Sequence, residues 1–117
     1  MARLKKLVAE ARRYLNDGEQ VETAVIGMYR YQSDGRRWEG TKYGALIATD
    51  RRILFYSKSL FGSRLYSHSY PEITSIECGR VLWTWSIKFT TVRTNCVLLD
   101  TTRRAEAFTR QVRSHIG

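Results

Sequence analysis

The chain has 117 residues, 43% of them hydrophobic and 26% charged, and its 20 basic against 11 acidic side chains give a formal net charge of +9. This length accommodates a single hydrophobic core, and the ordinary composition excludes a wholly disordered chain. No apolar run approaches the roughly 20 residues that a membrane-spanning helix needs, and no apolar signal segment follows the basic N-terminus, so we expect a cytoplasmic protein.

Most of the positive charge lies at the two ends of the chain. Residues 1–16 carry five basic residues against one acidic residue, and residues 103–117 carry four against one. The long segment between them is nearly neutral. A protein with this charge prefers an anionic partner, which leaves nucleic acid, acidic lipid and acidic protein open.

Residues 1–16 show a helical period. Apolar residues recur every three or four positions, at Leu4, Leu7, Val8, Ala11 and Leu15. Basic residues occupy the other side, at Arg3, Lys5, Lys6, Arg12 and Arg13. The pattern predicts a basic amphipathic helix ended by the turn residues Asn16-Asp17-Gly18. Its apolar stripe fits three uses: packing on the rest of the chain, packing on a second copy, or lying in an anionic membrane interface.

The segment after this helix predicts a strand and a hairpin. Val21–Tyr31 is rich in β-forming residues, and residues 44–49 and 52–56 predict a tight hairpin through Asp50-Arg51. The intervening residues 32–43 are too long for a simple turn. Basic residues gather in and beside this loop, at Arg30, Arg36, Arg37 and Lys42. Loops on a rigid β scaffold commonly carry binding residues, so this loop is a candidate binding segment.

The next two apolar segments predict a further pair of strands. Residues 63–70 and 73–78 each have strand character and are separated by a short connection. The connection contains Pro71, which has no amide hydrogen for a central ladder and therefore belongs outside the strands.

The last part of the chain predicts two strands and a helix. Strict apolar alternation over residues 81–89 predicts a strand with Trp83 and Trp85 on one face. We expect this face in the core, and if it lies outside it is an interface. Residues 92–99 predict the last strand, and Asp100-Thr101-Thr102 offer N-caps for a helix after it. The apolar stripe of that helix is Ala105, Phe108, Val112 and Ile116. About seven short strands closed by one helix predict an antiparallel barrel or sandwich.

Two motifs point to a known family. Residues 44–56, with the sequence GALIATDRRILFY, and residues 70–77, YPEITSIE, resemble signatures of the bacterial pleckstrin-homology (PH)-like domains, especially the YokE-like group. The lead-in LNDGE before the first strand is also similar, and the resemblance spans roughly residues 15–116. It implies a mainly β fold, a seven-stranded PH-like antiparallel barrel capped by a C-terminal helix, over residues 17–117. The amphipathic helix of residues 1–16 precedes it.

The first motif has a physical explanation as a structural signature. Its members are Thr49, Asp50, Arg51, Arg52, Ile53 and Phe55. Thr49 and Asp50 are suited to accept hydrogen bonds from turn amides. One of the two arginines is expected to pair with Asp50 or with a carboxylate of a neighbouring strand, and the apolar members supply the core. We therefore expect these residues to maintain the fold rather than to contact a ligand.

Catalytic and metal-binding chemistry has little support in the sequence. His68 stands between two serines, but neighbouring strand residues point to opposite faces, so a surface histidine is expected. Cys78 and Cys96 have neither a CxxC partner nor a histidine at ligand spacing, which predicts two reduced thiols. We expect no enzyme activity, no metal and no cofactor.

The sequence thus predicts a non-catalytic binding or adaptor module. The expected partner is a protein, including a second copy of the chain, because both terminal helices carry apolar stripes. An anionic membrane surface is another expected partner, with a peripheral location, and a basic nucleic-acid-binding protein is the alternative. The candidate contacts to an anionic surface are Arg3, Lys5, Lys6, Arg12, Arg13, Arg30, Arg36, Arg37 and Lys42.

Overall fold

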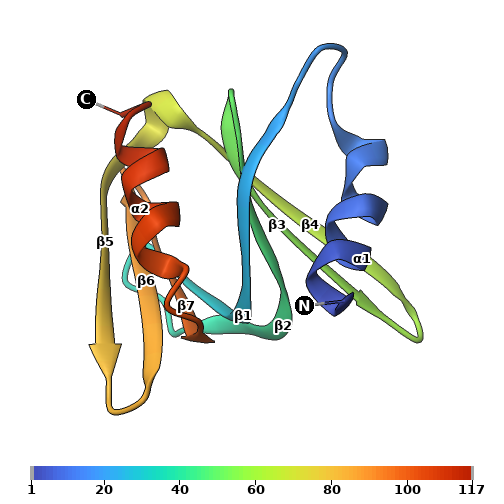
Figure 1. Ribbon diagram of the computed structural model, residues 1–117. Coiled ribbons are helices and arrows are strands. Elements are labelled where there is room, and N and C mark those ends of the chain that lie inside the picture. Colours follow the sequence, from blue (N-terminus) through green and yellow to red (C-terminus); the bar gives the residue numbers. More distant parts are fainter. Residues whose placement is uncertain (1, 117) are drawn as a thin grey trace.

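The computed structural model describes residues 2–116 and folds them into seven strands, two α-helices and two short 3-10 helices (Figure 1). The strands are β1 (Val21–Ser33), β2 (Glu39–Thr49), β3 (Arg52–Ser59), β4 (Gly62–Ser69), β5 (Ile73–Val81), β6 (Thr84–Thr91) and β7 (Thr94–Thr101). The helices are α1 (Ala2–Ala11), η1 (Arg12–Tyr14), η2 (Tyr70–Glu72) and α2 (Ala105–Arg113). All neighbouring strands are antiparallel, in the order β4-β3-β2-β1-β7-β6-β5. The predicted PH-like fold is confirmed.

The curled sheet encloses the main hydrophobic core. His68 on the edge strand β4 lies edge-on to Phe89 of β6, with ring centroids 5.5 Å apart, although four strands separate β4 from β6 in the sheet order. Tyr29 of β1 stacks on Phe55 of β3 in the interior. Helix α2 contacts β1, β5 and β6 and adds the fully buried Phe108 to this core (Figure 1). The predicted C-terminal cap is therefore an integral part of the core.

Strands β2 and β3 are buried on both faces. Residues 44–49 and 53–57 are continuously buried, although side chains alternate between the two faces of a strand. Leu46 and Phe55 point into the barrel, whereas Ile47 and Leu54 belong to a second apolar cluster on the outer face. The unbroken apolar run in the first motif is the sequence signature of a strand covered on both sides.

Gly44, the first residue of that motif, lets β2 and β3 approach closely. A Cβ atom at Gly44 would overlap the carbonyl oxygen of Tyr56 and lie 2.8 Å from Cζ of Phe55. The neighbouring atoms are backbone and a core ring, which have little room to move. A glycine is required here by space rather than by its backbone conformation.

Helix α1 covers the outer face of β1, β2 and β3. Leu4, Leu7 and Ala11 are buried in the outer cluster, and α1 lies on a different side of the sheet from α2 (Figure 1). The basic residues of α1 remain exposed. Of the three uses that the apolar stripe fits, the structure shows packing within the chain, because burying the stripe on the sheet removes it from water.

The predicted pairing of residues 63–70 with 73–78 is wrong. β4 pairs with β3, and β5 pairs with β6, so that β4 and β5 form the two edges of the sheet. The connection through Pro71 is η2, and the backbone amide of Ser69 donates to the Glu72 side chain across it, at 3.1 Å. This helical turn redirects the chain instead of folding it back as a hairpin. Pro71 itself lies outside the strands, as predicted.

The strand predicted over residues 81–89 is wrong at its start. Leu82 and Trp83 form the turn between β5 and β6, where Leu82 has a φ of 56°. Trp83 is therefore 81% exposed rather than in the core, whereas Trp85 is half-buried against it. The apolar alternation continues through this turn, which contains no glycine, proline or asparagine. The hydrophobic period by itself therefore did not indicate the turn.

The extent of the predicted loop 32–43 and the start of helix α2 also differ from expectation. The predicted loop 32–43 is mostly strand, and the turn is only residues 34–38. Helix α2 begins after Arg104, which makes no side-chain capping bond. Thr102 supports the helix start instead, because its hydroxyl accepts the Arg104 amide at 3.3 Å and its carbonyl accepts the Ala105 amide at 2.9 Å.

Candidate binding site for an anionic surface

The signature hairpin is organised around a buried carboxylate, Glu19. The Thr49 hydroxyl accepts the backbone amides of Arg51 and Arg52 at 3.0 Å each and donates to Glu19 Oε2 at 2.6 Å. Arg52 donates to both Glu19 carboxylate oxygens, from Nε at 2.9 Å and from Nη2 at 3.0 Å. This two-pronged geometry is the strongest form of an arginine–carboxylate pair. Asp50 instead accepts the amide of Gln20, at 2.9 Å.

The sequence analysis did not identify Glu19 as the carboxylate that pairs with Arg52. Its side chain is fully buried, and it lies in the LNDGE segment just before β1. Burial alone would raise its pKa, but hydrogen bonds from Arg52, Thr49 and the Asn16 amide lower the pKa from 4.5 to about 2. The carboxylate therefore stays charged and ties the start of β1 to the β2–β3 turn, a structural role.

The predicted anionic-surface contacts are distributed over three parts of the molecule. Lys5, Lys6, Arg12 and Arg13 are exposed on α1 and η1. Arg36 and Arg37 are exposed in the β1–β2 turn, and Arg30 lies over the ring of Trp38, 5.8 Å from its centroid. Arg3 and Lys42 line one depression together with two further cations, Lys58 and Arg64.

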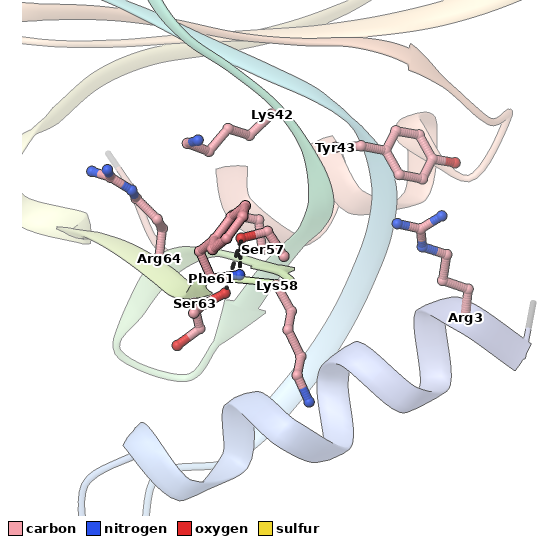
Figure 2. Close-up of a pocket in the computed structure, with 10 residues that line it drawn as sticks. Arg3, Lys42, Tyr43, Ser57, Lys58, Phe61, Ser63 and Arg64 are labelled. Carbon is pink, nitrogen blue, oxygen red and sulfur yellow. Dashed lines mark hydrogen bonds between the residues drawn. The ribbon is translucent and has the colours of Figure 1, made fainter.

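That depression, the β3–β4 groove, has a volume of about 680 Å³. Its lining residues are Arg3, Lys42, Tyr43, Ser57, Lys58, Ser59, Phe61, Gly62, Ser63 and Arg64. Figure 2 shows that its cations come from α1, β2, β3 and β4, that Ser57, Ser63 and Phe61 lie between them, and that the Lys58 side chain runs toward α1. Four cations and three serines, with no acidic lining residue, form an environment suited to anionic oxygen atoms.

Of the four cations that line the groove, only Lys58 forms an ion pair within residues 2–116. Lys58 pairs with Glu10 at 3.0 Å, and this carboxylate raises the pKa of Lys58. Arg3 stacks over the ring of Tyr43, 4.8 Å from its centroid. Lys58 and Arg64 were not among the sequence candidates. They flank the β3–β4 turn, and a basic residue on each side of an exposed hairpin turn is the signal that indicates them.

A separate buried cluster contains His68, Tyr29 and Cys96. The Tyr29 hydroxyl lies 3.4 Å from both His68 Nε2 and Cys96 Sγ, and Cys96 Sγ lies 3.9 Å from His68 Nε2. Burial raises the pKa of Cys96 to about 11, so the thiol is protonated at neutral pH and is a poor nucleophile. Sequence reasoning placed His68 on the surface, but only 18% of its side chain is exposed. Packing against Phe89 accounts for the difference.

This environment makes folding stability sensitive to His68 protonation. Burial lowers the pKa of His68, against the opposing effect of Glu72, whose carboxylate lies 3.6 Å from Nδ1. The unfolded chain therefore binds this proton more readily than the folded chain, and stability falls as the pH falls below the ordinary histidine value. We expect His68→Gln to flatten the pH dependence of the unfolding free energy between about pH 7 and about pH 5, measured by urea denaturation. An unchanged slope would contradict this expectation.

The fold has counterparts among solved structures. The PH domain of USP37 superposes with a TM-score of 0.59 at 11% identity, over 80% of this chain and 96% of that chain. A C-terminal domain of an unknown protein from Leishmania infantum gives a TM-score of 0.63 at 17% identity, over 95% and 96%. A DUF1696 family protein with a PH domain from Shewanella loihica PV-4 gives 0.60 at 16% identity, over 96% and 92%. These likenesses define a PH fold.

The family follows from the sequence itself. The family model for the bacterial PH domain matches residues 15–114, a range that includes all seven strands and α2. The chain belongs to this family, as its two motifs predicted. No protein of curated function matches the chain. The match begins after α1, but the division into a helix of residues 1–16 and a domain of residues 17–117 stays a prediction.

The family and the fold place the chain among domains that commonly mediate binding. PH domains commonly act as binding modules for proteins or lipids and generally lack catalytic activity. Among the described residues, no helix is both long enough and apolar enough to cross a membrane. Within residues 2–116 no three His, Cys, Asp or Glu side chains are grouped so as to hold a metal ion.

Proposed function

We propose that this PH domain is a non-catalytic binding module that attaches to an anionic surface through the β3–β4 groove. The convergence of Arg3, Lys42, Lys58 and Arg64 on a groove with no acidic lining residue carries the proposal. The exposed basic residues of α1 extend the same positive field beside the groove. A cation near an anionic surface contributes about 1 kcal/mol, so the three groove cations that form no ion pair within residues 2–116, Arg3, Lys42 and Arg64, support attachment together.

Contact with a protein through the apolar stripes of the terminal helices is disfavoured, because both stripes pack against the sheet within the chain. Self-association retains one supporting observation, since the outer edges of β4 and β5 have no partner strand within residues 2–116. Unpaired edges can add a strand from a second copy. Light scattering after size exclusion tests this second candidate, and a strict monomer at high concentration would remove it.

Paired charge removal tests the anionic-surface proposal. Lys42→Gln with Arg64→Gln removes two cations of the groove, and Arg36→Gln with Arg37→Gln removes two exposed cations of the β1–β2 turn. We expect the groove pair to weaken binding to phosphatidylserine vesicles about thirtyfold at low salt, and the turn pair to have a much smaller effect. The measurement is vesicle co-sedimentation at several salt concentrations, with duplex DNA as a second probe.

The outcomes separate the candidate functions. Binding that falls steeply with salt and depends on the groove pair supports the proposal. Equal losses for both pairs would show that total charge alone acts, and would overturn the assignment to the groove. Failure to bind either vesicles or DNA at low salt would overturn attachment to an anionic surface altogether.

A further inference from the structure

Two hairpin turns expose large apolar side chains to water. In the β3–β4 tip, Leu60 is 97% and Phe61 98% exposed. In the β5–β6 tip, which comprises residues 81–83, Val81, Leu82 and Trp83 are exposed as well. Neither set is used in the core. Consecutive exposed residues of this size commonly mark a contact surface for another molecule.

The two tips lie at the same end of the molecule. In Figure 1 both turns are at the lower end of the view, together with the N-terminal ends of α1 and α2. Helix η2 and the C-terminal end of α2 lie at the opposite end. The molecule measures 31 × 30 × 28 Å, so the two tips at this end are separated by no more than about one molecular width.

Both tips have cations beside them. Lys58 and Arg64 of the β3–β4 groove flank the first tip, and Arg80 directly precedes the second. Arg103, in the connection before α2, lines a depression together with Arg80, Trp85 and Glu106. Its nearest acidic group is Glu106, at 3.8 Å. At least one basic residue therefore lies beside each apolar tip.

Local hydrogen bonds hold both tips in shape. The Ser59 hydroxyl accepts the Phe61 amide and donates to the Gly62 carbonyl, both at 3.3 Å. Arg80 Nε donates to the Leu82 carbonyl at 3.0 Å, and the Thr84 hydroxyl donates to the Val81 carbonyl at 3.1 Å. These bonds satisfy backbone groups that would be costly to bring into an apolar medium.

We infer that the anionic surface is a lipid bilayer and that the β3–β4 and β5–β6 tips enter its interface together. The inference rests on the proposed attachment to an anionic surface. Aromatic and aliphatic side chains favour the headgroup–acyl boundary, while the surrounding cations contact anionic headgroups. Nucleic acid offers stacking partners for Phe61 and Trp83, but it leaves the aliphatic Leu60, Val81 and Leu82 in water. The composition of the tips thus favours lipid.

The test removes apolar surface without changing charge. One variant combines Leu60→Ser with Phe61→Ser, and another combines Leu82→Ser with Trp83→Ser. Val92→Ser is the matched control, because Val92 is 80% exposed in the β6–β7 turn. We expect each tip variant to weaken binding to phosphatidylserine vesicles about tenfold at every salt concentration. The control should bind as the wild type does, and unchanged thermal unfolding would show that all variants fold.

Insertion also has a spectroscopic signature. Trp83 should be quenched by vesicles with brominated acyl chains, and Trp83→Ser should remove that quenching. Binding that persists in both tip variants, without quenching of Trp83, would overturn insertion while leaving electrostatic attachment intact. Tighter binding to duplex DNA than to vesicles would overturn the bilayer as partner. Absence of binding to either probe would overturn the proposed function and this inference together.

Discussion

Replacement of Glu19 by glutamine is expected to lower the free energy of unfolding by about 3 kcal/mol at neutral pH. The glutamine side chain has nearly the same shape as the glutamate it replaces. It carries no charge, so Arg52 loses the carboxylate to which it donates two hydrogen bonds, at a position where the Glu19 side chain is fully buried. It also removes the charged acceptor of the Thr49 hydroxyl. The start of β1 would then lose its attachment to the β2–β3 turn. Chemical denaturation monitored by fluorescence measures the change.

The pH dependence of the unfolding free energy provides a control for the Glu19→Gln prediction. Because the pKa of Glu19 is lowered from 4.5 to about 2 in the folded protein, its stabilising effect is present above pH 4.5 and is lost as the pH falls toward 2. The stability difference between wild type and Glu19→Gln should therefore shrink over that range. Lys58→Gln, which breaks the solvent-screened pair with Glu10, should change stability much less than Glu19→Gln does. A constant difference at all pH values would contradict the role of Glu19.

Phe108→Ala is expected to destabilise the protein by about 3–5 kcal/mol. Phe108 is fully buried where α2 closes the barrel, and the smaller side chain leaves a cavity among residues of the sheet. Arg110→Ala, on the exposed side of the same helix, should change stability by less than about 0.5 kcal/mol. Thermal and urea unfolding measure both variants. A small effect of Phe108→Ala would mean that α2 is not part of the cooperative core.

These two variants also calibrate the binding experiments. Glu19 and Phe108 act through the fold, whereas the residues of the β3–β4 groove and of the two tips are exposed or border solvent. Loss of binding in a groove or tip variant that unfolds like the wild type therefore reports on the contact itself. Loss in Glu19→Gln or Phe108→Ala would instead follow the fraction of unfolded protein.

The recurrence of apolar residues at helix or strand spacing in short segments predicted much of the fold. The stripe of residues 1–16, the hairpin around Asp50-Arg51 and the C-terminal helix each require only neighbours within about a dozen positions. The same patterns failed where a turn lacks its usual residues. Leu82 and Trp83 continue an apolar alternation across the β5–β6 turn, so a bent chain and a straight strand have the same local sequence pattern.

The candidate site was much less accessible to sequence reasoning. Arg3 and Lys42 were candidates because they are basic, but so were seven other residues that the fold places elsewhere. Lys58 and Arg64 join the groove only because β3 pairs with β4 and α1 crosses the outer face of the sheet. Nothing in the sequence near Arg3 indicates that residue 64 will lie in the same depression.

By itself, the sequence determined the class of fold, the family and the need to cover two apolar helix stripes. The hydrophobic period of a helix or strand shows which of its faces must be buried, because the side chains that share a face recur at that spacing. It does not show what will cover that face. Only the tertiary structure decided that α1 packs on β1, β2 and β3, that Glu19 receives Arg52, and that four distant cations line one groove. Each of these depends on long-range strand pairing, which local patterns do not encode.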